Sequence, residues 1–76
     1  MEYVITDHAR AKMRLRGVTE EEVAYVIHNY STTYPADNSG TTLFGVLADG
    51  SSVRLWVAGG LPLQEPVIIK SVVGRN

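Results

Sequence analysis

The chain must build its fold around one hydrophobic core, because it has 76 residues and no cysteine. A chain of this length buries only about 60% of the surface that its unfolded form exposes, so a second independent core is excluded. Without cysteines there are no disulfides and no thiolate metal sites to reinforce the core. We therefore expect a single domain over residues 1–76, in which helices and strands cover one another's apolar faces.

The clearest local signal predicts a helix over about residues 19–29. Thr19 and Glu22 have the spacing of a capping box, in which each side chain accepts a hydrogen bond from the other residue's backbone N–H. Apolar residues then recur at helical spacing from Val23 to Tyr30. One stripe of this helix is therefore expected to face the core.

A first helix is expected over about residues 8–16. Thr6 or Asp7 can serve as its N-cap, and Gly17 can adopt the positive φ that ends many helices. Four of the seven basic residues lie in this segment, whereas residues 17–50 hold no lysine or arginine. The net charge of −1 thus excludes a globally basic nucleic-acid-binding surface but allows a local basic patch.

The remaining segments predict strands and loops. Residues 3–5 are a short β-prone stretch, and residues 31–41 are rich in turn-forming residues and are expected to be a loop. Asp49-Gly50 predicts a type I′ hairpin turn. Three further strands are expected, over residues 42–48, 53–57 and 67–73. This order predicts an α+β fold, with two N-terminal helices packed on one face of a small, mostly antiparallel three- to four-stranded sheet.

The first helix carries a candidate site for RNA. With about 100° of rotation per residue, His8, Lys12 and Arg16 form one narrow stripe. Two cations can bind a phosphodiester, and an imidazole can transfer the protons that cleavage by a 2′-hydroxyl requires. A structural role stays open, because a histidine near an N-cap commonly bonds to backbone and such cations commonly solvate a helix face.

The predicted sheet offers a second half of this site. Arg54 and Trp56 share one strand face, and Lys70 lies on a neighbouring strand. An arginine beside an exposed aromatic ring can hold a phosphate while the ring stacks on a base. The alternative is that Trp56, the one tryptophan of the chain, belongs to the core. No metal site is expected, because the two histidines lie far apart in sequence and no ligand motif is present.

Residues 5–23 resemble the bacterial and archaeal family called domain of unknown function 4258, with its pattern T-x-H-A-x-x-R-M-x-x-R-G-I-[ST]-x-x-x-V. Lys12 replaces the arginine of this pattern, and Val18 replaces the isoleucine. The direct matches are His8, Ala9, Met13, Arg16, Gly17, Thr19 and Val23. The family has no settled biochemical role, but its layout is similar to that of small toxin ribonucleases of the RelE and BrnT kind.

By position, this resemblance implies His8 as the catalytic residue and Lys12 and Arg16 as phosphate-binding residues, to which the sheet adds Arg54. The hypothesis that follows is a toxin-like RNA-binding or RNA-cleaving domain, working as a metal-independent ribonuclease with no cofactor. The expected partners are RNA and a small antitoxin-like protein. The alternative is a non-catalytic protein-interaction module, for example a homodimer. No leader or membrane-spanning run is recognised, so no membrane association and a cytoplasmic location are expected.

Overall fold

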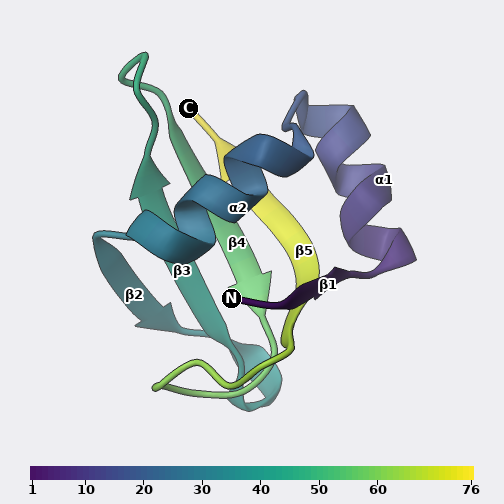
Figure 1. The fold of residues 1–76 in the computed structure, drawn as a ribbon. Helices are drawn as coiled ribbons and strands as arrows, with labels where there is room; N and C mark the ends of the chain where they lie inside the picture. Colours follow the sequence, from purple (N-terminus) through teal and green to yellow (C-terminus); the bar gives the residue numbers. More distant parts are fainter.

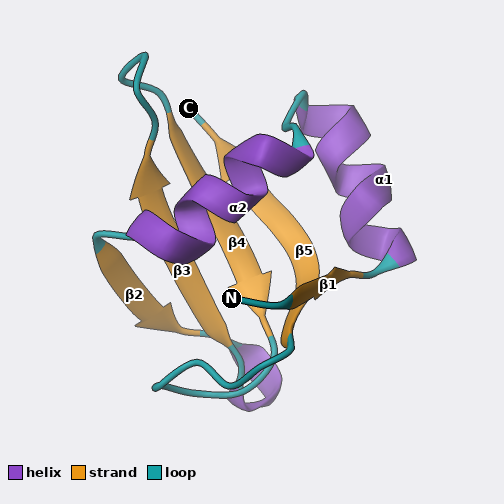
Figure 2. Ribbon diagram, in the orientation of Figure 1, coloured by secondary structure: helices purple, strands orange, loops and turns teal.

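Five β-strands form one sheet, and two α-helices pack against it (Figures 1 and 2). The structure, a computed structural model, describes residues 1–76. The strands lie in the order β1-β5-β4-β3-β2. Along the chain the elements are β1 (Tyr3–Ile5), α1 (Asp7–Arg16), α2 (Glu20–Asn29), β2 (Thr32–Pro35), the 3-10 turn η1 (Asp37–Ser39), β3 (Thr41–Val46), β4 (Ser52–Val57) and β5 (Val67–Arg75).

The expected fold class was wrong about the sheet, which has five strands rather than three or four and is mixed, because one of its four pairings is parallel. β1 pairs in parallel with β5, so that Val4 lies opposite Ile68. β1 has only three residues, and so short a run carries no periodicity from which its partner could be read. α2 crosses the sheet over β3 and β4, whereas α1 packs alongside β5 (Figure 1).

β2 adds the fifth strand from the segment that was expected to be a loop. It pairs antiparallel with β3, and Thr33 lies opposite Leu43. This strand was not predicted because residues 31–41 are rich in turn-forming residues. Pro35 also lacks the backbone N–H that a residue of a central strand must donate. At the edge of a sheet that N–H is not required, so proline is tolerated there.

The ends of both helices follow the sequence signals. The Thr6 hydroxyl accepts a hydrogen bond from the Ala9 N–H at 3.1 Å and caps α1. Gly17 ends this helix in the left-handed conformation, with φ of 66°. At α2, the side chains of Thr19 and Glu22 each accept from the other's backbone N–H, so the predicted capping box is confirmed.

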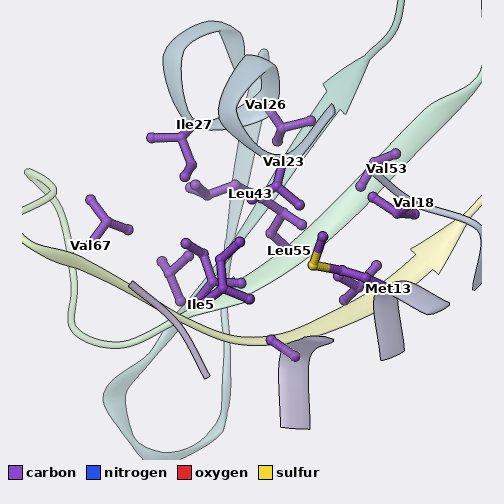
Figure 3. Packing of buried hydrophobic residues seen from close by; sticks show 14 of the residues in the cluster. Ile5, Met13, Val18, Val23, Val26, Ile27, Leu43, Val53, Leu55 and Val67 are labelled. Carbon is purple, nitrogen blue, oxygen red and sulfur yellow. The ribbon is translucent and has the colours of Figure 1, made fainter. Parts of the chain in front are cut away.

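One face of the sheet, which we call the covered face, packs against the helices to make the core (Figure 3). α2 contributes Val23, Val26 and Ile27 to it, and α1 contributes Ala9 and Met13. The full core consists of Ile5, Ala9, Met13, Val18, Val23, Val26, Ile27, Leu43, Leu47, Val53, Leu55, Val57, Val67, Ile69 and Val72. Neither helix has the length and apolar character needed to cross a membrane.

The close packing of α2 on β3 depends on a glycine. A Cβ atom at Gly45 would lie 3.0 Å from a methyl carbon of Val26. That separation is shorter than the roughly 3.5–4.0 Å at which two carbon atoms attract each other best. Gly45 therefore sets how near the helix can come to the sheet.

Candidate nucleic-acid interface

The other side of the sheet, which we call the open face, has no helix over it. Along β4 the side chains alternate, so that Val53, Leu55 and Val57 are buried and Arg54 and Trp56 are partly exposed. The register of the strands brings further side chains onto the same side as Arg54 and Trp56. The open face consists of Val4, Tyr34, Thr42, Phe44, Arg54, Trp56, Ile68, Lys70 and Val73.

Two cations on the open face have no carboxylate partner. The protein contains two ion pairs, and neither of them involves Arg54 or Lys70. The Lys70 ammonium instead lies 5.1 Å from the centroid of the Trp56 ring, which is within the range of a cation–π contact. The positive charge of this face is therefore available to an anion from outside.

A second glycine makes room for one of these cations. The guanidinium of Arg54 lies against Gly74 of β5, and a Cβ atom at Gly74 would collide with it. Arg54 is paired with Phe44 of β3 on its other side. The arginine thus lies across the sheet between an aromatic ring and a bare stretch of backbone.

Two neighbouring hollows indent the open face. Thr42 and Val73 border both of them. The first has a volume of about 360 Å³ and is completed by Tyr34, Phe44 and Arg54. The second has a volume of about 280 Å³ and is completed by Pro35, Ala36, Asp37 and Trp56. Each hollow therefore combines an aromatic ring with one charged side chain, of opposite sign in the two cases.

The indole of Trp56 is fixed under the turn that follows η1. A Cβ atom at Gly40 would lie 2.5 Å from the indole Nε1, so only glycine allows this approach. The indole N–H is buried and has no hydrogen-bond acceptor. Trp56 is thus held by packing, with its ring on the open face rather than in the main core.

On α1, the predicted residues have different surroundings. His8 is exposed and forms no ion pair. Lys12 is half-buried and forms no ion pair. Arg16 is exposed, but its Nε donates a hydrogen bond to the Val72 carbonyl of β5 at 3.1 Å. The stripe therefore keeps its charge accessible and is attached to the sheet at one end.

The contact of Arg10, on the opposite side of α1, shows which way the side chains of His8 and Lys12 point. Arg10 contacts Glu20 of α2 at 3.4 Å, on the covered side of the sheet. At about 100° per residue, His8 and Lys12 lie roughly 160° away from Arg10 around the helix. These two side chains consequently face away from α2, toward the side on which the open face lies. Arg54 is not in contact with them, because β5 lies between α1 and β4.

The sequence predicted that Arg54 and Trp56 share one face and that Lys70 lies on a neighbouring strand, but it did not predict the other aromatic residues of the open face. The sequence favours a packing role for Tyr34, and because residues 31–41 are expected to be a loop it gives no strand face for this residue; the structure places Tyr34 on β2. Phe44 could not be placed from the predicted turn, because a two-residue loop at Asp49-Gly50 would pair Gly45 with Arg54. The observed register instead pairs Phe44 with Arg54.

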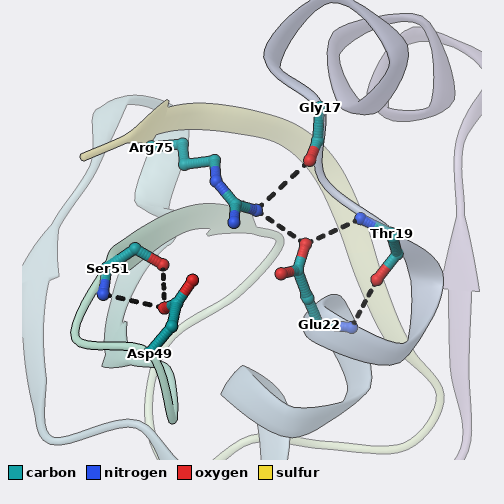
Figure 4. A network of polar contacts seen from close by, with 6 residues as sticks. All are labelled: Gly17, Thr19, Glu22, Asp49, Ser51 and Arg75. Carbon is teal, nitrogen blue, oxygen red and sulfur yellow. Dashed lines mark hydrogen bonds and ion pairs between the residues drawn. The ribbon is translucent and has the colours of Figure 1, made fainter.

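A separate polar network joins the C-terminal end of β5 to the start of α2 (Figure 4). Arg75 donates hydrogen bonds to the Glu22 carboxylate at 2.6 Å and to the Gly17 carbonyl at 3.2 Å. The hydrogen bond from Arg75, followed by that from the Thr19 backbone N–H, lowers the pKa of Glu22. Nearby, hydrogen bonds from Ser51 lower the pKa of Asp49. These carboxylates are engaged in structural contacts and do not form an acid–base site.

Comparison of the chain with protein-family models, with curated proteins and with solved structures finds no match. The resemblance of residues 5–23 to domain of unknown function 4258 therefore stays a prediction.

Proposed function

We propose that this protein binds single-stranded RNA on the open face of its sheet. The observation that carries the proposal is that Arg54 and Lys70 have no carboxylate partners and lie among the aromatic rings of that face. Cations without internal partners attract phosphate, and aromatic side chains stack on unpaired bases. The combination favours an unpaired strand, because bases in a duplex are stacked on one another and out of reach.

The stripe on α1 extends the same surface. Lys12 and Arg16 supply two further cations, and the exposed His8 supplies a group that can accept or donate a proton. An RNA strand lying across β5 toward α1 would place its backbone near these three side chains. On this basis the proposal includes metal-independent cleavage, with His8 as the catalytic residue and the cations as phosphate-binding residues.

The binding step is tested by fluorescence anisotropy with a labelled oligouridine. Arg54→Ala and Lys70→Ala should each weaken binding and reduce the dependence of log Kd on log salt by about one unit. Arg14→Ala is the matched control, because Arg14 is an exposed and unpaired cation of α1 outside the stripe. If all three variants bind as the wild type does, or if the wild type binds no RNA, the proposal is wrong.

The cleavage step is tested by incubating RNA with wild type and His8→Ala in the presence of a chelator. Products should appear with the wild type and disappear with the variant, while the thermal unfolding of the two proteins stays the same. Expression of the wild type should also arrest bacterial growth if the toxin-like role holds. Binding without any cleavage would limit the function to RNA binding.

A second candidate function, a homodimer through the open face, is favoured by the apolar side chains there. Val4 is 48% exposed and Val73 is 41% exposed. Sedimentation equilibrium separates the two functions: a stable dimer that Val73→Asp dissociates, together with no affinity for RNA, would favour the interaction module. A monomer that binds RNA supports the first function.

A further inference from the structure

The two hollows of the open face differ in the charge that they present. Arg54 borders the first, and Asp37 of η1 is the charged residue that borders the second. A carboxylate repels phosphate, so the second hollow is unsuited to the backbone of an RNA strand. A ligand group in that hollow must instead offer hydrogen-bond donors.

The Asp37 carboxylate is free to accept such donors. Its side chain is exposed and forms no ion pair with any cation of the protein. The η1 turn is closed through the backbone instead, where the Gly40 N–H donates to the Asp37 carbonyl at 3.2 Å. The orientation of the carboxylate is thus independent of the contact that forms the turn.

The walls of this hollow suit a flat ring. Trp56 borders one part of it, and Pro35 and Ala36 border another, so apolar surface adjoins the single carboxylate. The indole is fixed by its close approach to Gly40. A planar base can therefore rest against a rigid apolar wall while its edge reaches Asp37.

Among the RNA bases, guanine has the matching edge. Its N1–H and its exocyclic 2-amino group are two adjacent donors, and the two oxygens of a carboxylate can accept both. Adenine and cytosine present one amino group beside an acceptor nitrogen, and uracil presents one N–H between two carbonyl groups. A carboxylate that replaces water at this edge therefore discriminates guanine from the other three bases.

We infer that the second hollow is a guanine subsite, in which Asp37 reads the Watson–Crick edge and Trp56 contacts the ring. This inference rests on the proposed binding of single-stranded RNA, and it adds a preferred base. Arg54 then holds a phosphate at the first hollow, next to the bound guanosine, because Arg54 and Trp56 lie two residues apart on β4. That separation corresponds to about 6.8 Å along the strand.

The inference is tested with oligouridines that carry one central guanine, inosine, adenine or cytosine. The guanine oligonucleotide should bind about tenfold more tightly than the adenine or cytosine oligonucleotide, as a bidentate contact to a base provides. Inosine lacks the 2-amino group and should lose most of this advantage. Asp37→Asn should abolish the preference for guanine while oligouridine itself binds at least as tightly as before.

Glu21→Gln serves as the matched control, since Glu21 is an exposed carboxylate of α2 without a partner, away from the open face. Equal affinity for all four oligonucleotides would overturn the guanine subsite and leave RNA binding intact. A preference for guanine that survives in Asp37→Asn would overturn it as well. If no oligonucleotide binds, both the proposed function and this inference fall.

Discussion

The two faces of the sheet are built by the same strands but have opposite character. On β4, Leu55 is fully buried, whereas its neighbours Arg54 and Trp56 are partly exposed. The covered face holds the apolar side chains that stabilise the fold, because burying each of them removes apolar surface from water. The open face contributes little to that core. The aromatic and cationic side chains of the open face are therefore not needed for the core and are available to bind a ligand.

The exposed aromatic and apolar side chains of the open face also create a risk of aggregation. An exposed apolar patch rimmed by polar groups marks a binding surface or promotes aggregation. The open face offsets this liability with Arg54 and Lys70, which keep it charged and hydrated. The difference between the faces can be tested by substitutions that act on one side and spare the other.

The largest effect is expected from truncating adjacent residues of β3 on opposite faces. Leu43→Ala should lower the free energy of unfolding by about 3 kcal/mol, because it leaves a cavity in the core. Phe44→Ala, on the open face, should cost less than about 1 kcal/mol. Urea denaturation measures both. Equal costs would show that the open face is covered in solution.

The second-largest effect on stability is expected at Gly45, where α2 lies close to the covered face. Gly45→Ala should lower the free energy of unfolding by about 1–2 kcal/mol, because the added methyl group meets Val26. Gly60→Ala is the matched control, since a Cβ there meets nothing within 4 Å. It should change stability by less than about 0.5 kcal/mol. A neutral Gly45→Ala would mean that α2 shifts freely on the sheet.

A smaller effect is expected from the polar network at the end of β5. Glu22→Ala should cost about 1 kcal/mol, because it removes half of the capping box and the partner of Arg75. Glu22→Gln should cost less, since it keeps an acceptor for the Thr19 N–H. A larger cost for the glutamine variant would contradict this account.

The same carboxylate predicts a pH dependence of stability. Its pKa is lowered in the folded protein, so its contribution is fully present above the ordinary value of 4.5. The contribution is lost as the pH falls through the lower, folded pKa. Thermal unfolding of wild type and Glu22→Gln should therefore converge as the pH is lowered below 4.5. If the unfolding temperatures of the two proteins instead moved further apart as the pH was lowered, the predicted pH dependence would be wrong.

The smallest effect on stability is expected on the open face itself. Lys70→Met should change the free energy of unfolding by less than about 0.5 kcal/mol, because Lys70 is partly exposed and forms no ion pair. The emission of Trp56, the one tryptophan of the chain, should nevertheless change when the ammonium leaves its ring. An unchanged spectrum would show that the two side chains do not meet in solution.

Local signals were predictable from the sequence, and pairing between distant segments was not. The capping box at Thr19 and Glu22 and the end of α1 at Gly17 involve neighbours in the chain, and both were expected correctly. The parallel pairing of β1 with β5 joins residues more than sixty positions apart. Three residues carry too little pattern to specify such a partner. The mixed five-stranded sheet was therefore missed.

In the candidate site, too, features within one segment were predictable from the sequence, whereas features that join distant segments were not. Alternation within β4 was enough to place Arg54 and Trp56 on one face. The helical period predicts one stripe of His8, Lys12 and Arg16, and a shared role of these side chains stays a prediction. The second hollow was not predictable, because Asp37 and Trp56 meet only through the β3–β4 register and the η1 turn. Its lining depends on tertiary structure that no single segment encodes.

The parallel contact between β1 and β5 has a consequence for the order in which the protein assembles during synthesis. β5 lies between β1 and β4 in the sheet, but it follows all the other described elements along the chain. Until β5 leaves the ribosome, β1 has no strand to pair with and β4 is paired only with β3. The apolar stripe of α2 is then only partly covered. Completion of the fold is thus postponed until β5 has left the ribosome, and a nascent chain halted before β5 would be a ready target for chaperones and proteases.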